Sequence, residues 1–214
     1  MNIELTNVCK TIKGITVLEN ISLNMTSGKI YGFQGINGSG KTMLMRAISG
    51  LIKCTKGTIK INNRILGKDI TFPENMGILI ENPAFLDGYT GFENLRILAS
   101  IKKEVSDNDI ISILREVGLN PNDKKKYRKY SLGMKQRLGI AAAIMENPDL
   151  IILDEPTNAL DTDGVDMMKK LILKHKERNA LIILSCHDLD FLKSVSDEII
   201  LLENGKLKGG YDEK

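Results

Sequence analysis

The stretch Gly35–Thr42 reads Gly-Ile-Asn-Gly-Ser-Gly-Lys-Thr and matches the pattern G-x-x-x-x-G-K-[ST] at every required position. An apolar run, Lys29–Gln34, precedes it, and a helical pattern, Lys41–Ser49, follows it. Glycine lets a chain turn back so that successive backbone N–H groups point at phosphate oxygens, beside a helix N-terminus that favours anions. The stretch therefore predicts a phosphate-binding loop between a strand and a helix.

The polar residues of this loop have separate predicted roles. Lys41 supplies a mobile positive charge for the β and γ phosphates of a nucleoside triphosphate, and the Thr42 hydroxyl can ligate Mg²⁺. The alternative is a glycine-rich turn before an amphipathic helix, which arises by chance in roughly one per cent of chains of this length. The loop alone fits kinases, GTPases, helicases and transport ATPases. The residues expected to bind phosphate are Gly35, Asn37, Gly38, Ser39, Gly40, Lys41 and Thr42.

The composition of the 214-residue chain is that of a globular protein, with 42% apolar and 27% charged residues. The net charge of +3 and the scarcity of aromatic residues (five Phe, five Tyr, no Trp) disfavour nucleic-acid binding. No apolar run approaches the roughly 18 residues of a membrane-spanning helix, and no signal peptide is visible. Cys9, Cys54 and Cys186 are widely spaced and support neither a disulfide framework nor a zinc site. We therefore expect one cytoplasmic domain over residues 1–214.

Short β-rich runs alternate with helical patterns, which favours an α/β fold with a parallel sheet and crossover helices. The unbroken apolar runs of the later strands suit burial on both faces, whereas the first two runs suit an antiparallel β edge. The predicted strands are Ile3–Val8, Thr16–Asn24, Lys29–Gln34, Gly57–Ile61, Met76–Ile80, Leu150–Leu153, Ala180–Ser185 and Glu198–Glu203. The predicted helices are Lys41–Ser49, Phe92–Lys102, Asp107–Val117, Leu132–Glu146, Asp163–Arg178 and Asp188–Ser194.

Successive helical patterns without a strand break this alternation between Ile80 and Leu150. We therefore predict a helical lobe, at about residues 83–129, inserted in the core of the domain. Near the end of the chain, Asn204-Gly205 predicts a two-residue hairpin after the last strand.

Two adjacent carboxylates, Asp154 and Glu155, follow the apolar run Leu150–Leu153. Side chains alternate along a strand, so the two carboxylates point in different directions at its carboxyl end, where open α/β sheets bind ligands. Asp154 is the candidate to hold Mg²⁺, and Glu155 is the candidate general base that activates water. The alternative is a solvated strand end.

A second apolar run, Leu181–Leu184, leads to His187, which we expect to donate a hydrogen bond to a γ phosphate. The alternative for a lone histidine is a surface or core position without a role in the reaction. The other histidine, His175, lies in a lysine-rich helical pattern, and we expect it to be solvated.

Further motifs follow in a fixed order and cover essentially the whole chain. They are Glu81-Asn82-Pro83, Tyr130–Arg137 (Tyr-Ser-Leu-Gly-Met-Lys-Gln-Arg), Asp154–Asp161 (Asp-Glu-Pro-Thr-Asn-Ala-Leu-Asp) and His187. Together with the phosphate-binding loop, these motifs resemble the ATP-binding cassette (ABC) family of transport ATPases. The resemblance implies a P-loop NTPase fold with a parallel-sheet core, an antiparallel β edge and an inserted helical lobe.

The resemblance also implies an ATPase that forms a head-to-tail homodimer, or a pseudo-dimer with a related ATPase, around two ATP molecules and Mg²⁺. Ser131 and Gly133 of one subunit would meet the γ phosphate held by the other, and Asp161 would act across the interface. Ile12 and Val17 fall at nucleotide-binding positions of the family. The implied partner is a separate membrane permease, with the ATPase peripheral on the inner face of the cell membrane and no nucleic acid bound.

Two departures from the family pattern narrow the resemblance. The family signature usually reads LSGGQ, whereas Tyr130–Met134 keeps only its serine and its second glycine. The family usually carries Gln where Glu81 stands, and we expect Glu81 to contact Mg²⁺ and to sense or position the reacting phosphate. A Glu at this position resembles the exporters that protect bacteria against lantibiotics and bacitracin, which implies export of an antimicrobial peptide or drug.

Two other functions stay open at this point. Soluble ABC ATPases that act on nucleic acid or the ribosome carry paired cassettes or a long coiled coil, and this chain has no sustained heptads. A metabolic P-loop kinase would leave Ser131–Gly133 unexplained. The basic run Lys124–Lys129 fits an anionic surface or a solvated face. A group of apolar residues could either dock a permease or pack within the lobe. They are Phe85, Leu86, Tyr89 and Phe92.

The resemblance places an aliphatic residue, Ile12, where the family stacks an aromatic ring on adenine. Without that contact with an aromatic face, recognition of the base should be weak and tolerant, so we expect GTP to compete measurably with ATP. Equilibrium binding of both nucleotides measures this competition. A preference for ATP above about a hundredfold, roughly 2.7 kcal/mol, would contradict the prediction.

Overall fold

The computed structural model describes residues 1–211, and its strands form two sheets. The larger sheet has the strand order β10-β9-β3-β8-β7-β6. Its strands are β3 (Ile30–Gln34), β6 (Met76–Leu79), β7 (Leu150–Asp154), β8 (Leu181–Ser185), β9 (Glu198–Glu203) and β10 (Lys206–Tyr211). The smaller sheet, in the order β2-β1-β4-β5, contains β1 (Asn2–Ile12), β2 (Ile15–Thr26), β4 (Lys56–Ile61) and β5 (Arg64–Ile65). The last three residues of the predicted 1–214 domain lie outside the described residues.

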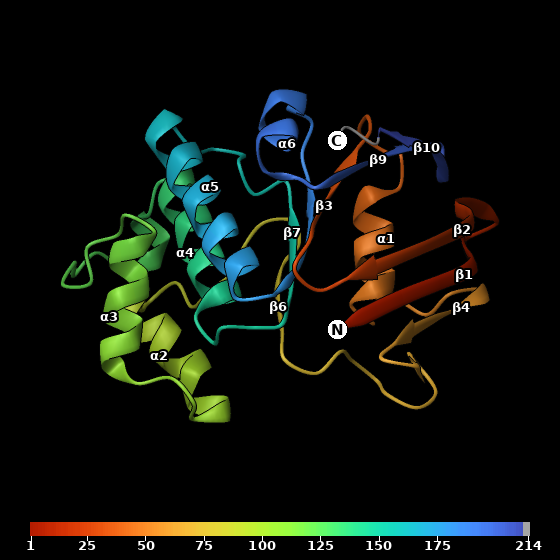
Figure 1. Ribbon diagram of the computed structural model, residues 1–214. Coiled ribbons are helices and arrows are strands. Elements are labelled where there is room, and N and C mark those ends of the chain that lie inside the picture. Colours follow the sequence, from red (N-terminus) through yellow and green to blue (C-terminus); the bar gives the residue numbers. More distant parts are fainter. Residues whose placement is uncertain (212–214) are drawn as a thin grey trace.

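The helices lie in two layers on either side of the larger sheet. Their bounds are α1 (Lys41–Ile48), α2 (Gly91–Lys102), α3 (Asp107–Glu116), α4 (Leu132–Ile144), α5 (Thr162–Glu177) and α6 (Leu189–Val195), with a short 3-10 helix at Tyr127–Lys129. Figure 1 shows α1 between the two sheets and α2 to α5 together on the opposite side of the larger sheet. Since α1 contacts strands of both sheets, it joins them into one body.

The central strands β7 and β8 are buried along their whole length, as their unbroken apolar sequences predict. Ile151 and Leu153 of β7 pack in the core with the helices α2 to α6, whereas Leu150 and Ile152 pack in the core around α1 and the smaller sheet. Alternate side chains of one strand therefore serve two hydrophobic cores.

The parallel pairing of β3, β7 and β8 positions the site. Residue pairs along the ladders are Ile30 with Ile182, between β3 and β8, and Asp154 with Ser185, between β7 and β8. The three strands consequently end at the same edge of the sheet, where ligands bind in α/β folds.

All predicted strands and helices are present, with β1 extending four residues beyond its predicted end at Val8. The predicted antiparallel pair β1–β2 exists but belongs to a separate sheet, and the antiparallel edge of the parallel sheet is β10 on β9. The predicted hairpin is confirmed, because Asn204 and Gly205 both have positive φ, of 49° and 74°, between β9 and β10. The short strand β5 was not predicted, since two residues carry no periodicity.

The helices α2 and α3 fall within the predicted lobe at residues 83–129. Each begins with a reciprocal capping box, from Thr90 and Glu93 in α2 and from Ser106 and Asp109 in α3. Both helices pack against α4, whose buried face belongs to the same hydrophobic core. The lobe as a separate unit remains a prediction.

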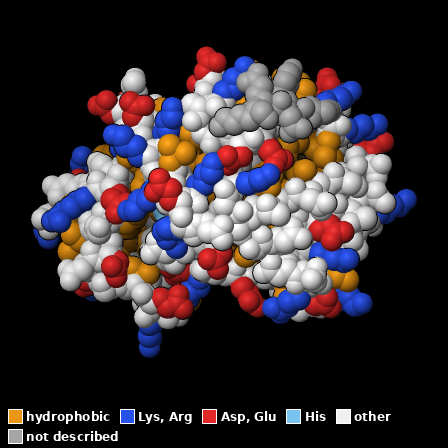
Figure 2. All heavy atoms as spheres, viewed as in Figure 1, with side chains coloured by type: hydrophobic (Ala, Val, Ile, Leu, Met, Phe, Trp, Pro, Cys, Tyr) orange, Lys and Arg blue, Asp and Glu red, His pale blue; other side chains and the backbone are white. Residues whose placement is uncertain are grey.

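Lys, Arg, Asp and Glu side chains are interspersed over the face of the molecule in Figure 2, without a large area of one sign. This face therefore shows no basic stripe of the kind that binds nucleic acid backbones. Within residues 1–211, no helix combines the length and the apolar composition that crossing a membrane requires.

The prediction that His175 is solvated is wrong. Its side chain is buried, only 4% exposed, against the core between α4, α5 and the larger sheet, and Nδ1 lies 2.8 Å from Nη1 of Arg178. Lysines of α5 point outward, but the ring itself lies on the apolar face of the helix. Burial, followed by the nearby positive charges of Arg178 and Lys174, lowers the pKa of His175 from 6.5 to about 4.

We expect His175 to make the protein less stable in mild acid. Because its pKa is lower in the folded chain than in the unfolded chain, the unfolded chain binds the proton more readily below pH 6.5. The free energy of unfolding should fall by about 2 kcal/mol from this residue between pH 7 and pH 5. Urea unfolding of wild type and His175→Gln at both pH values measures the effect. Equal losses of stability in the two proteins would contradict it.

Candidate functional site

The phosphate-binding loop leaves the carboxyl end of β3 and leads directly into α1. The first helical residue is Lys41, and the N-cap is Gly40 with a φ of 108°. No side chain caps this helix N-terminus, so its backbone N–H groups remain available to an anion. The loop therefore has the geometry that its sequence predicts.

The loop packs closely against neighbouring backbone, which requires glycine. A Cβ atom at Gly40 would lie 2.9 Å from the carbonyl oxygen of Val17, so any larger residue would collide with β2. The backbone N–H of Gly205, in the β9–β10 hairpin, donates to the carbonyl oxygen of Ser39 at 2.8 Å. Val17 thus lies beside the loop, whereas Ile12 lies at the far end of β1, paired with Ile15 and 39% exposed.

Lys41 is folded over the loop and is almost buried, with 6% of its surface exposed. Its Nζ donates to the carbonyl oxygen of Gly35 at 2.6 Å and lies 3.6 Å from Oε1 of Glu155. The ammonium group therefore lies between the phosphate-binding loop and the end of β7, where an anion between these elements would meet it.

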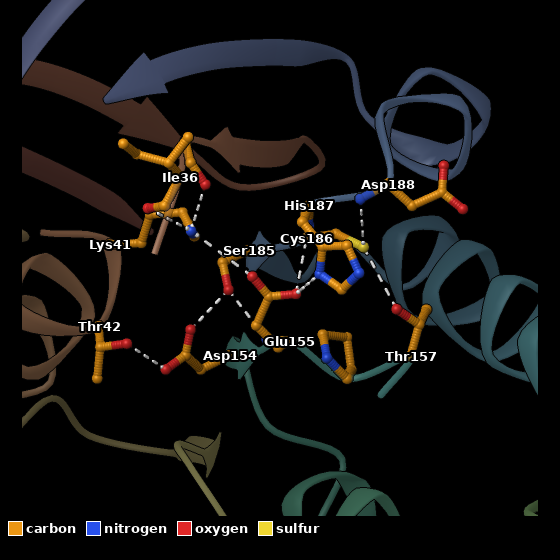
Figure 3. Close-up of polar contacts among 12 residues, drawn as sticks. Ile36, Lys41, Thr42, Asp154, Glu155, Thr157, Ser185, Cys186, His187 and Asp188 are labelled. Atoms are coloured by element: carbon orange, nitrogen blue, oxygen red, sulfur yellow. Dashed lines mark hydrogen bonds and ion pairs between the residues drawn. The ribbon is translucent and has the colours of Figure 1, made fainter. Parts of the chain in front are cut away.

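Asp154 is held by two hydroxyl groups, as Figure 3 shows. Thr42 Oγ1 donates to Asp154 Oδ2 at 2.6 Å, and Ser185 Oγ donates to Asp154 Oδ1 at 2.6 Å. Asp154 is only 6% exposed and Ser185 is fully buried. The hydroxyl of Thr42 and the carboxylate of Asp154 are adjacent oxygen ligands of the kind that Mg²⁺ prefers.

Glu155 points away from Asp154, toward His187, as the alternation along β7 predicts. Glu155 Oε2 lies 2.9 Å from His187 Nδ1 and accepts the His187 backbone N–H at 3.3 Å (Figure 3). The backbone of Glu155 has a positive φ of 49°, and its N–H donates to Ser185 Oγ at 2.9 Å. Gln136 Nε2 donates to the carbonyl oxygen of Pro156 at 3.0 Å, which fixes the chain after Glu155.

Glu81 follows β6 and forms an ion pair with Arg46 of α1, Nη2 to Oε1 at 2.8 Å. Its side chain is 59% exposed and its φ is 59°. The described contacts do not bring Glu81 to Thr42 or Asp154, the other predicted Mg²⁺ ligands. The Glu81 carboxylate instead extends the site toward α1, and the Arg46 guanidinium balances its charge.

Ser131 caps α4 as predicted, with Oγ accepting the Met134 backbone N–H at 3.2 Å. A Cβ atom at Gly133 would lie 2.8 Å from the carbonyl oxygen of Ala159, which ties the start of α4 to the segment after β7. Leu132, in place of the family's glycine, is 74% exposed. The start of α4 is therefore a surface feature.

Asp161 caps α5 through Gly164, whose backbone N–H lowers the pKa of the Asp161 carboxyl, with a further contribution from Arg137. Arg137 Nη2 lies 2.9 Å from Asp161 Oδ1, while its Nη1 donates to the carbonyl oxygen of Val117. Asp161 stays largely exposed, at 73% of its side chain, so the cap does not hide it from a partner.

The sequence leaves open the roles of an apolar group and of a basic run, and the structure shows which of their side chains are buried. Phe85 and Phe92 pack against the helical core, whereas Leu86 and Tyr89 are about half exposed, at 51% and 45%. Within the basic run, Tyr127 is buried and its hydroxyl donates to the carbonyl oxygen of Pro83. The run is therefore anchored at its centre, with lysines on its solvated sides.

Sequence reasoning missed several residues of the site, and they are Arg46, Gln136, Arg137, Ser185 and Cys186. Each acts through a contact between segments that are distant in sequence, as Arg46 does with Glu81. Gln136 and Arg137 carried a signal, since both lie in the motif Tyr130–Arg137, and Ser185 carried one because it ends an apolar run next to the strand of Asp154.

A family model described as ABC transporter matches residues 18–158, more than half of the chain. The chain belongs to the ABC transporter family. This finding confirms the family that the ordered motifs predict.

Similar proteins agree with this assignment. The uncharacterised ABC transporter ATP-binding protein YybJ of Bacillus subtilis (strain 168) is 49% identical over 206 residues, which cover 96% of this chain and 94% of YybJ. The bacitracin transport ATP-binding protein BcrA of Enterococcus faecalis is 40% identical over 207 residues, covering 96% of this chain and 67% of BcrA. The dimeric structure of MJ0796, a bacterial ABC transporter cassette, matches with a TM-score of 0.90 and 26% identity over 99% of each chain.

The comparisons confirm the predicted P-loop NTPase fold and the predicted class of protein, an ABC transporter subunit that binds and hydrolyses ATP. The predicted similarity to ABC proteins named for bacitracin transport is confirmed as well. Nothing in them supports the alternatives of an ATPase that acts on nucleic acid or the ribosome, or of a metabolic kinase.

We expect Ser185→Ala to weaken both the fold and the site of this ABC subunit. The substitution removes the donor to the buried carboxylate of Asp154, which costs about 1–3 kcal/mol of unfolding free energy, and it leaves the Glu155 N–H with only the Ser185 carbonyl oxygen, 3.2 Å away, as acceptor. Chemical denaturation measures this loss, and Ser100→Ala, at an exposed site on α2, is the control. A variant as stable as the control would contradict the importance of this hydroxyl.

Proposed function

We propose that this ABC subunit hydrolyses ATP to power a separate membrane permease that exports an antimicrobial peptide or drug, as a means of self-protection. The observation that carries the catalytic part is the convergence of Lys41, Asp154 and Glu155 at one sheet edge. The substrate class rests on the 40% identity to BcrA, named for bacitracin transport, and on the glutamate at position 81.

In this proposal, the loop and the start of α1 bind the triphosphate of ATP. The backbone N–H groups between Asn37 and Lys41 bind phosphate oxygens, that of Ser39 after leaving the Ile36 carbonyl, and the Lys41 ammonium leaves the Gly35 carbonyl for the β and γ phosphates. Val17 lies beside the loop and contacts the nucleotide. Ile12 offers only an aliphatic surface, and no aromatic ring, to the adenine base of ATP.

Thr42 and Asp154 would hold Mg²⁺, whose charge stabilises the negative charge that develops on the phosphates. The two side chains already touch, and the Ser185 hydroxyl keeps the Asp154 carboxylate in place. Glu81, paired with Arg46, supplies a third carboxylate near α1 that senses or positions the reacting γ phosphate.

Glu155 accepts the proton of the attacking water as the general base. The strained backbone at Glu155 and its bond to Ser185 aim the carboxylate away from Asp154. His187 lies against Glu155 and is two-thirds exposed, so its ring can donate to a γ phosphate in front of it. General-base catalysis of this kind contributes roughly a hundredfold to ten-thousandfold.

Two copies of the chain, or this chain and a related ATPase, would complete each site. Ser131 and Gly133 lie at an exposed helix N-terminus, which suits a phosphate held by the other subunit. Asp161 is exposed nearby and would act across the interface. The dimer of the MJ0796 cassette supports this arrangement.

The permease would dock on the lobe of residues 83–129, through the exposed Leu86 and Tyr89. This contact would hold the ATPase on the inner face of the cell membrane. Because α2 and α3 pack on α4, whose N-terminus carries Ser131, a change at the nucleotide would reach the docking surface through one core.

The decisive variant is Glu155→Gln. Glutamine keeps the size of the side chain but cannot take a proton, so we expect ATP turnover to fall at least about a hundredfold while ATP binding and the ATP-bound dimer persist. Steady-state phosphate release and size-exclusion chromatography with ATP measure the two effects. Glu104→Gln, at an exposed position in the loop between α2 and α3, is the control and should behave as wild type. Full turnover in Glu155→Gln would remove Glu155 from the role of base.

A further inference from the structure

A third side chain lies beside the Glu155–His187 pair, and the proposed reaction does not use it. Cys186 precedes His187 after the end of β8 and is fully buried. One carboxylate oxygen of Glu155, the Sγ of Cys186 and a ring nitrogen of His187 all lie within 4.8 Å of one another. Figure 3 shows the three side chains grouped beyond the carboxyl ends of β7 and β8.

These donors are the ligand types that zinc selects, namely thiolate, imidazole and carboxylate. Zinc bonds of about 2.0–2.3 Å in a tetrahedron separate the ligand atoms by roughly 3.3–3.8 Å. Glu155 Oε2 and His187 Nδ1 are 2.9 Å apart, and the sulfur lies within 4.8 Å of a donor atom of each residue, so the three donors are close enough to share one ion.

The surroundings of the sulfur also fit a bound metal. The backbone N–H of Asp188 donates to Cys186 Sγ at 3.4 Å, and Thr157 Oγ1 lies 3.3 Å from the same sulfur. Hydrogen bonds of this kind orient a metal ligand. Burial raises the pKa of the Cys186 thiol, so the metal itself must displace the proton. His187 is 66% exposed, so the metal and a water molecule as fourth ligand can approach from its side.

We propose that Glu155, Cys186 and His187 form an inhibitory binding site for Zn²⁺ in the nucleotide-free protein. On binding, the Cys186 thiol releases its proton to solvent, and the sulfur, a His187 nitrogen and a Glu155 oxygen bond to the ion. The inhibitory effect rests on the proposed function, because zinc would bind Glu155, the proposed general base, and His187, which the proposed reaction also uses.

This site is separate in chemistry from the Thr42–Asp154 pair. That pair offers oxygen ligands only, which suit Mg²⁺, and Asp154 is turned away by its bonds to Thr42 and Ser185. The soft sulfur of Cys186 gives the second site its preference for zinc over magnesium. The linear spacing of the cysteines does not reveal it, because Glu155 and Cys186 meet only through the pairing of β7 with β8.

Direct metal binding tests the site without any need for activity. Nucleotide-free protein is titrated with Zn²⁺ by calorimetry and with Co²⁺ by absorption, since a sulfur–cobalt bond gives a charge-transfer band. We expect one ion per chain and a band that disappears in Cys186→Ser and persists in Cys54→Ser, the control thiol. His187→Gln should weaken zinc binding at least about tenfold. A band that survives in Cys186→Ser, or zinc affinity unchanged in both site variants, would overturn the proposal.

Inhibition of ATP hydrolysis tests the consequence. At fixed Mg²⁺ and ATP, the Zn²⁺ concentration that halves turnover should rise at least about tenfold in Cys186→Ser and stay unchanged in Cys54→Ser, and a chelator should restore the wild-type rate. Equal inhibition of all three proteins would overturn the inhibitory role. If the protein binds zinc through Cys186 but hydrolyses no ATP, the site stands and the proposed function fails.

Discussion

The Ser185 hydroxyl, fully buried between β7 and β8, joins the two carboxylate residues of the site. It donates to the side chain of Asp154 and accepts the backbone N–H of Glu155, so one group fixes both the position of a carboxylate and the turn of the chain after it. Both hydrogen bonds form because Asp154 and Ser185 are partners in the parallel ladder of β7 and β8. The site therefore depends on strand register, since a slip of one residue would turn each side chain to the opposite face.

Register in turn depends on burial. The strands β7 and β8 place alternate apolar residues in two cores, one with the helices and one around α1, so neither face of these strands accepts a polar side chain before Asp154 and Ser185. The phosphate-binding loop is fixed from outside the parallel strands, by Val17 of β2 and by the Gly205 backbone in the β9–β10 hairpin. The smaller sheet and the C-terminal hairpin thus act as supports for the loop.

The same arrangement accounts for which sequence predictions succeeded. The strands and helices follow from apolar runs, caps and the Asn204-Gly205 turn, which are local signals, and the divergence of Asp154 and Glu155 follows from alternation along a strand. His175 was misjudged because its neighbours in sequence are lysines, whereas a helix presents one residue in three or four to the core. The Arg46–Glu81 and Arg137–Asp161 pairs join segments 24 or more residues apart, and no local pattern foretells them.

By itself, the sequence determined the order of elements, the phosphate-binding loop, the two carboxylates after β7 and the family to which these motifs belong. The tertiary structure decided which side chains touch: Asp154 with Thr42 and Ser185, Glu155 with His187 beside Cys186, and Glu81 with Arg46. The physical reason is that motifs and periodicity report local backbone preferences, whereas these contacts depend on how strands pair and helices pack across the whole chain.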